Sequence, residues 1–179
     1  MSTTQADSTA FEVPVIDISP YTGNGTAEDR ARVADEMDRA CSTVGFVQVL
    51  GHAVPDDVWR GLGEAVDDFF GQSLEEKKTY VAQGNRGYSP PKSESLSLSL
   101  GIEAASRMND FFEAFNVGTE ARSFAGLDLS EDDYGINVWP DLDGFRPKVE
   151  EYYAHAARVA RVLTSVFADA LSLPSDFFE

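Results

Sequence analysis

The stretch from Gly144 to Leu171 constrains the fold of this chain most, because it is the longest uninterrupted periodic segment in the sequence. Its apolar residues recur at alternating steps of four and three, which keeps their side chains on one face of a helix. They are Phe145, Val149, Tyr152, Ala156, Val159, Leu163, Val166 and Ala170. We therefore predict one long amphipathic helix that turns its apolar stripe toward a core and its charged side toward water.

Three shorter helices are predicted before the long one. Thr26 and Asp56 each carry a side-chain oxygen that can cap the first turn of a helix. Ser73 is followed by Glu76 in the spacing of a capping box, which predicts a short helix there. The helix that follows Asp56 is expected to bury Val66 together with the rest of its apolar stripe.

Three runs of β-forming or apolar residues predict strands, at 13–19, 46–50 and 110–118. The second run is apolar except for Gln48, so we expect a buried strand. Between 81 and 109, glycine and proline interrupt any period. The alternation of serine and leucine at 93–100 is compatible with a strand, but its low complexity equally suits a loop, and we expect a loop there. Helices and strands in this mixture predict an α+β fold.

The length of 179 residues, 42% of them hydrophobic, suffices for one globular domain with a substantial core. Residues 1–10 lack apolar periodicity and are expected to form a disordered tail, which leaves 11–179 for the folded body. The sequence has no recognisable secretory signal and no apolar run of membrane-spanning length, which predicts a cytoplasmic protein. Cys41, the one cysteine, is expected to be a buried structural thiol, with a reactive thiol as the alternative.

The formal net charge of -17 argues against two classes of partner. Acidic residues lie at many helical positions rather than in one tail, and such a surface repels the phosphates of nucleic acids and of anionic membranes. We therefore expect no nucleic-acid or membrane partner. A solvated acidic surface is the simpler explanation of this charge, and an acidic decoy protein is the alternative.

Five segments of the chain, taken in order, resemble landmarks of the amino-terminal half of the isopenicillin N synthase-like iron(II) and 2-oxoglutarate-dependent oxygenases. They are Val13–Ser19, Gly45–Pro55, Arg86–Tyr88 with Glu94, Asn137–Pro140 before Phe145-Arg146 and Tyr152-Tyr153, and Leu171–Phe178. Each is weak by itself, but their order and spacing agree across nearly the whole chain after the tail.

The resemblance implies the amino-terminal helices and first strands of a double-stranded β-helix, or jelly roll, supported by the long helix. In that family a His-x-Asp pair and a distant histidine hold Fe(II), and an Arg-x-Ser motif binds 2-oxoglutarate. All of these follow the long helix. Here only His52 and His155 are present, and neither begins a His-x-Asp or His-x-Glu triplet. We therefore expect no catalytic residue and no metal ligand in this chain, whose carboxy-terminal catalytic half is expected to be absent.

Arg86 and Tyr88 are the residues that the resemblance places nearest to substrate. The planar guanidinium of arginine suits a carboxylate and the tyrosine offers a hydroxyl on a rigid ring. A structural ion pair, for instance between Arg86 and Glu94, or a packing role explains the same residues equally well. Asn137 and Trp139 are expected to belong to the scaffold, and His52 to stabilise a turn by a hydrogen bond.

The resemblance implies part of an oxidoreductase that hydroxylates, desaturates or cyclises a small molecule with Fe(II), dioxygen and 2-oxoglutarate. By itself the chain is predicted to be inactive and to bind neither cofactor. Its expected partners are the missing carboxy-terminal half or a second copy of itself. The alternative is a catalytically inactive oxygenase-like protein or an acidic binding module that acts by protein interaction.

Overall fold

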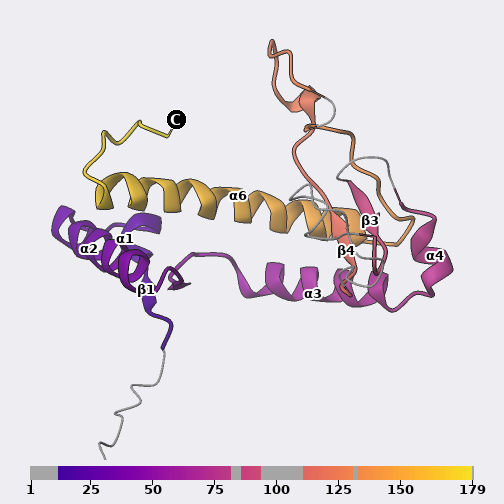
Figure 1. The fold of residues 1–179 in the computed structure, drawn as a ribbon, viewed down its shortest axis with the longest axis horizontal. Coiled ribbons are helices and arrows are strands. Elements are labelled where there is room, and N and C mark those ends of the chain that lie inside the picture. The colour runs from indigo at the N-terminus through magenta and orange to yellow at the C-terminus, as the bar shows by residue number, and fades with distance from the viewer. Residues whose placement is uncertain (1–11, 82–85, 94–110, 131–132, 179) are drawn as a thin grey trace, which may run out of the picture. The chain divides into compact units, whose positions relative to one another are not determined.

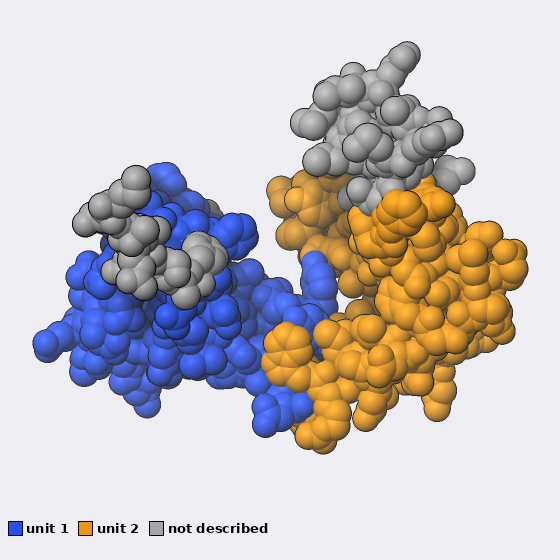
Figure 2. Space-filling view, turned by 60° about the horizontal axis from the view of Figure 1, so that its bottom comes forward, with its two compact units in different colours: residues 1–56, 152–179 blue, residues 57–151 orange. Residues whose placement is uncertain are grey.

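The computed structural model describes residues 12–81, 86–93, 111–130 and 133–178. The chain divides into two compact units (Figure 2). Unit 1 comprises Met1–Asp56 and Tyr152–Glu179, and unit 2 comprises Asp57–Glu151. Among the described residues, no helix has both the length and the apolar character that a membrane span requires.

Four short strands are interspersed among the described helices along the chain (Figure 1). The helices are α1 (Ser19–Thr22), α2 (Ala27–Thr43), α3 (Asp56–Phe70), α4 (Leu74–Lys78), the 3-10 helix η1 (Ala121–Ser123) and α6 (Phe145–Ala170). The strands are β1 (Val15–Asp17), β2 (Gln48–Leu50), β3 (Gly87–Ser89) and β4 (Ala114–Asn116). The mixed α and β fold class is thereby confirmed at this level.

Unit 1 is built on a parallel pair of strands, with Val15 opposite Gln48 and Ile16 opposite Val49. One face of this pair packs on α2 and on the carboxy-terminal part of α6. The buried residues of this core are Ile16, Ile18, Val33, Met37, Ala40 and Val166. A step of four from Val33 to Met37 and a step of three from Met37 to Ala40 place these side chains on one face of α2, as the amphipathic pattern requires.

Unit 2 is built on an antiparallel pair, β3 and β4, in which Tyr88 lies opposite Phe115. Its core is mainly aromatic, and the first turn of α6 contributes to it. The buried residues are Ala65, Phe69, Tyr88, Phe145 and Val149, and Leu62, Phe70, Tyr80, Phe115, Val117, Trp139 and Leu142 pack against them.

Local sequence signals account for the helix starts. The hydroxyl of Thr26 accepts a hydrogen bond from the backbone N–H of Asp29, whose carboxylate accepts one from the Thr26 N–H. Ser73 and Glu76 form the same reciprocal capping box at α4. The long helix predicted at 144–171 is confirmed as α6, and its stripe residues are buried or half-buried.

Four sequence predictions were wrong. The run 46–50 is a strand only at its end and is not buried, because no described residue covers its outer face. The segment 81–109 was expected to be a loop, but it contains β3, since pairing with β4 outweighs the local glycine signal. Val66 lies at the edge of the apolar stripe and is exposed, and Cys41 lies on the exposed side of α2.

Candidate functional site

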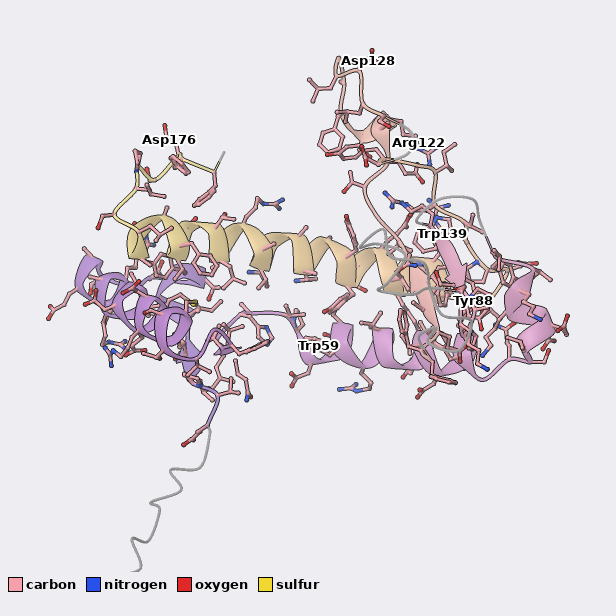
Figure 3. The ribbon with its side chains drawn as sticks, viewed as in Figure 1. Trp59, Tyr88, Arg122, Asp128, Trp139 and Asp176 are labelled. Carbon is pink, nitrogen blue, oxygen red and sulfur yellow. The ribbon has the colours of Figure 1, made fainter. Side chains whose placement is uncertain are left out.

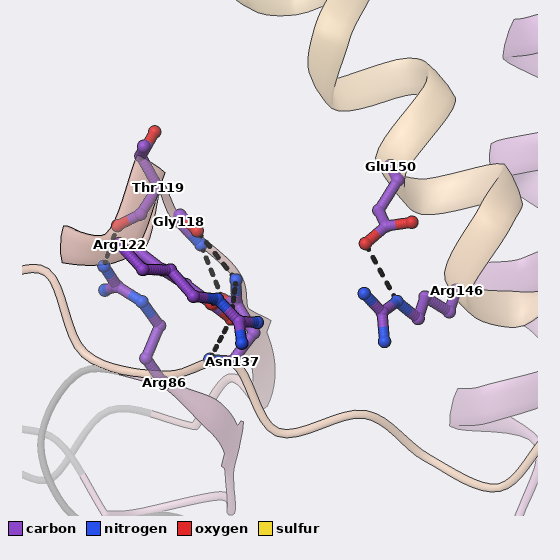
Figure 4. Close-up of polar contacts among 8 residues, drawn as sticks. Arg86, Gly118, Thr119, Arg122, Asn137, Arg146 and Glu150 are labelled. Carbon is purple, nitrogen blue, oxygen red and sulfur yellow. Dashed lines mark hydrogen bonds and ion pairs between the residues drawn. The ribbon is translucent and has the colours of Figure 1, made fainter. Parts of the chain in front are cut away.

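Arg86, one of the two predicted substrate-binding residues, directs its guanidinium group toward the backbone. The Nη2 atom donates to the carbonyl oxygen of Asp133 at 3.0 Å. It also donates, over a longer 3.4 Å, to the carbonyl oxygen of Thr119, as Figure 4 shows. A β-carbon added at Gly118 would lie 2.5 Å from the same Nη2 atom. The guanidinium group therefore occupies the space that any side chain at position 118 would need.

Asn137 joins the same region from the other side. Its side chain accepts a hydrogen bond from the Gly118 N–H at 2.9 Å and donates to the Gly118 carbonyl at 2.8 Å (Figure 4). The buried carboxylate of Glu120 accepts from the Asn137 backbone N–H and forms an ion pair with Arg122. The hydrogen bond from the Asn137 N–H is the main cause that lowers the pKa of Glu120. Asn137 thus has the scaffold position that was predicted for it.

Tyr88, the second predicted residue, is only 2% exposed and belongs to the core of unit 2 (Figure 3). Its hydroxyl donates to the carboxylate of Glu113 on the segment that enters β4. Burial, followed by this hydrogen bond, raises the pKa of Tyr88 to about 12. The phenol therefore stays protonated and acts as a donor over the physiological range.

Lys77 completes a charged cluster with Tyr88 and Glu113, although it too is buried. Its Nζ atom lies 2.9 Å from Oε2 of Glu113, donates to the Phe70 carbonyl at 3.2 Å, and lies 5.7 Å from the ring centres of Phe70 and Tyr88. Two hydrogen bonds lower the pKa of Glu113. The one from Lys77 has the larger effect, and the one from Tyr88 comes second. Contacts among these three side chains connect α4 to β3 and to the start of β4.

Sequence reasoning did not identify Lys77, Glu113 or Gly118. The sequence shows that Glu113 is a charged residue within a run of phenylalanines and that Lys77 lies next to an amphipathic helix. Neither observation predicts which residue the side chain contacts. The predicted pairing of Arg86 with Glu94 involves a residue that lies outside the described ranges. Substrate contact by Arg86 and Tyr88 therefore stays a prediction.

The two histidines lie in different surroundings. Nδ1 of His52 accepts the Val54 N–H at 3.1 Å, the turn-stabilising bond that was expected, and Arg158 holds the same turn through the His52 and Ala53 carbonyls. Nδ1 of His155 is buried without a hydrogen bond from the described residues. No group of three His, Cys, Asp or Glu side chains suited to a metal occurs in the described part of the chain, whereas a facial triad needs three.

The comparison with protein families settles the relationship. The family described as "non-haem dioxygenase in morphine synthesis N-terminal" matches residues 13–142. The chain belongs to this family. This dioxygenase amino-terminal family is the one that the five landmarks in the sequence resemble, and its match extends from β1 to the residues just before α6.

Full-length relatives extend well beyond the matched region. A 2-oxoglutarate-dependent dioxygenase of Trichoderma harzianum is 30% identical over 94% of this chain and 51% of its own length. Isopenicillin N synthase of Streptomyces griseus is 31% identical over 93% of this chain and 50% of its own length. The chain therefore spans about half the length of the curated relatives it matches.

A solved structure supports the fold assignment. The 2OG-Fe(II) oxygenase family protein from Caulobacter crescentus superposes with a TM-score of 0.72 at 23% identity. The superposition covers 93% of this chain and 50% of that protein. At this identity the similarity concerns the fold, and it extends over both units of the chain.

Proposed function

We propose that this chain is the amino-terminal part of an iron(II) and 2-oxoglutarate-dependent oxygenase that oxidises a small molecule. The match of residues 13–142 to the dioxygenase amino-terminal family carries the proposal. Relatives named as 2-oxoglutarate-dependent dioxygenases, of which the chain covers about half, support it. In the complete protein, a jelly roll formed with the remaining half would hold Fe(II) and 2-oxoglutarate, and the present residues would supply scaffold and one wall.

The chain by itself is proposed to be inactive in this chemistry. In unit 1, Nδ1 of His52 accepts a hydrogen bond within a turn, and Nδ1 of His155 is buried without a hydrogen bond from the described residues. The described residues offer no set of three metal ligands. Because Fe(II) in this family needs two histidines and a carboxylate, the ligands are assigned to the half that the chain does not span. Residues 1–10 are proposed to be a tail outside the folded body, and the protein is proposed to work in the cytoplasm.

The decisive experiment compares the 179-residue chain with the product of the reading frame extended beyond Glu179. Both are purified identically and assayed for 2-oxoglutarate consumption with and without added Fe(II). We expect iron-dependent consumption by the longer product and none by the chain alone. Stoichiometric iron retained by the chain through a chelating wash would contradict the assignment of the ligands. A stop codon directly after Glu179 in the gene would favour a non-catalytic binding protein.

Arg86 and Tyr88 remain the proposed substrate contacts, although their contacts in unit 2 favour the structural alternative. Arg86→Ala in the longer product should weaken substrate binding by a factor equivalent to about 1.5–3 kcal/mol if the arginine pairs with a carboxylate. The melting temperature is measured beside the turnover. A large loss of melting temperature with unchanged substrate affinity would assign Arg86 to the scaffold.

A further inference from the structure

The connection between α1 and α2 presents an asparagine that is followed by a glycine. Asn24 and Gly25 are the only Asn-Gly pair in the sequence. Asn24 is exposed, and Gly25 is half-buried beside a cavity of about 720 Å³ in unit 1, so water reaches the pair. Glycine has no β-carbon that would hinder an approach to its backbone nitrogen.

Neither reacting group of this pair is held by a hydrogen bond. Among the described residues, the side-chain amide of Asn24 has no partner, and the backbone N–H of Gly25 donates to none. The backbone on either side is engaged, because the Gly23 N–H donates to a carbonyl of α1 at 3.0 Å and the Thr26 N–H donates to the Asp29 carboxylate at 3.1 Å. The two unbonded groups therefore lie together between two ordered turns.

The other two asparagines in the described part of the chain differ in both respects. Asn116 donates to the Ser89 hydroxyl at 3.2 Å, and the side chain of Asn137 is held at Gly118 by two hydrogen bonds. Each is followed by a valine, whose branched β-carbon hinders an approach to the backbone nitrogen. Among these three asparagines, only Asn24 combines an unbonded amide with an unhindered neighbour.

We propose that Asn24 is a site of spontaneous deamidation in the folded protein. Hydroxide removes the proton of the Gly25 N–H, and the backbone nitrogen attacks the side-chain carbonyl carbon of Asn24. The new C–N bond closes a succinimide ring, while the side-chain nitrogen takes a proton from water and leaves as ammonia. Water then opens the ring at either carbonyl, which gives aspartate or isoaspartate. The net reaction consumes one water and releases one ammonia.

The two products should affect unit 1 differently. Aspartate keeps the backbone and adds a negative charge near the amino terminus of α2, the end of a helix that favours such a charge. Isoaspartate lengthens the backbone by one carbon directly before Gly25. Gly25 packs so closely on Pro20 that an added β-carbon would lie 2.5 Å from the Pro20 Cα atom. We therefore expect isoaspartate to disturb this contact and the capping box that follows it.

The test incubates the 179-residue chain and the product of the extended reading frame at neutral and mildly alkaline pH, and peptide mass mapping follows each asparagine. We expect Asn24 to convert at least tenfold faster than Asn116 or Asn137, at a rate that rises with the hydroxide concentration. Asn24→Gln should abolish most of the ammonia release, because its attack would close a larger and less favourable ring. A short peptide of residues 22–28 gives the rate without the fold, and we expect the folded protein to react at a similar rate.

Three results would overturn the proposal: conversion of Asn24 no faster than that of Asn137, conversion many times slower in the folded protein than in the peptide, or undiminished ammonia release by Asn24→Gln. Asn24→Asp supplies the aspartate product in pure form and should melt at the temperature of fresh wild type. Wild type enriched in isoaspartate should melt lower, and equal melting would overturn the effect assigned to isoaspartate. None of these measurements needs a cofactor or a substrate, so their outcome is independent of the proposed oxygenase function.

Discussion

The core of unit 1 is aliphatic, with Ile16, Ile18 and Met37 at its centre, whereas the core of unit 2 surrounds the ring of Phe69 with five aromatic rings. The closest of these rings, that of Phe115, lies 4.7 Å from it between centroids. Unit 2 also contains the charged cluster of Lys77, Glu113 and Tyr88, in which Lys77 and Tyr88 are buried and Glu113 is half-buried.

This difference indicates how each unit obtains a specific structure. Aromatic edge-to-face pairs and charged hydrogen bonds have directional geometry, so unit 2 is specified by contacts among its own residues. Aliphatic packing is less directional, and among the described residues Val15 and Leu50 on the strands of unit 1 are exposed. Directional contacts therefore specify the structure of unit 1 less than that of unit 2.

The largest effect is expected from Phe69→Ala. Removing a fully buried ring with five aromatic neighbours should lower the free energy of unfolding by about 3–5 kcal/mol. The counterpart in unit 1, Met37→Ala, should cost about 2–5 kcal/mol but leave the near-ultraviolet circular dichroism of the aromatic core in place. Denaturant unfolding and near-ultraviolet spectra of both variants measure this. Loss of the aromatic signal in Met37→Ala would mean that the two cores unfold as one.

The ion pair of the charged cluster joins the buried Lys77 to the half-buried Glu113, so losing the carboxylate should be costly. Glu113→Leu leaves the Lys77 ammonium buried without its partner and should cost about 3 kcal/mol, while adding Lys77→Met should recover most of that loss. A double-mutant cycle measures the coupling. The matched exposed pair in unit 1 is Arg32 and Glu36, 3.2 Å apart, whose coupling should not exceed about 0.5 kcal/mol. Equal couplings would remove the distinction between the two pairs.

Acid should abolish the contribution of Glu113 to the free energy of unfolding. Its pKa is lowered in the folded state by Lys77 and Tyr88, so its stabilisation is fully present above the ordinary value of 4.5 and is lost as the pH falls through the lower folded-state pKa. The difference in unfolding free energy between wild type and Glu113→Gln should therefore shrink over that acidic range. Urea unfolding at a series of pH values measures it, and a difference independent of pH would contradict the role assigned to the carboxylate.

The smallest effects are expected at the two capping boxes, one in each unit. Thr26→Ala and Ser73→Ala should each cost about 1 kcal/mol. The cap of α2 supports a helix of 17 residues, whereas that of α4 supports one of five, so only Ser73→Ala should expose a whole helix to amide hydrogen exchange. If Ser73→Ala increases amide exchange in α4 no more than Thr26→Ala does in α2, then α4 is held by Lys77 rather than by its cap.

Local chemistry made several features predictable from the sequence. The capping residues Thr26 and Ser73 and the periodic stripe of α6 follow from hydrogen bonds and side-chain spacing within a few residues. The order of the five landmarks identified the family, which the match of residues 13–142 confirms. The turn bond of His52 was also predictable, because donor and acceptor are two residues apart.

Other features depended on contacts between residues far apart in the sequence. Glu113 meets Lys77 from 36 positions away, and Arg86 reaches the Asp133 carbonyl from 47, distances at which no local pattern specifies a partner. Likewise, the run 46–50 has the composition of a buried strand, but burial requires a covering surface. The sequence alone therefore determined the longer helices, the caps of α2 and α4, and the family. The tertiary structure decided which charges lie together and which side chains of the run 46–50 are exposed, because burial and pairing are properties of the surroundings rather than of the segment.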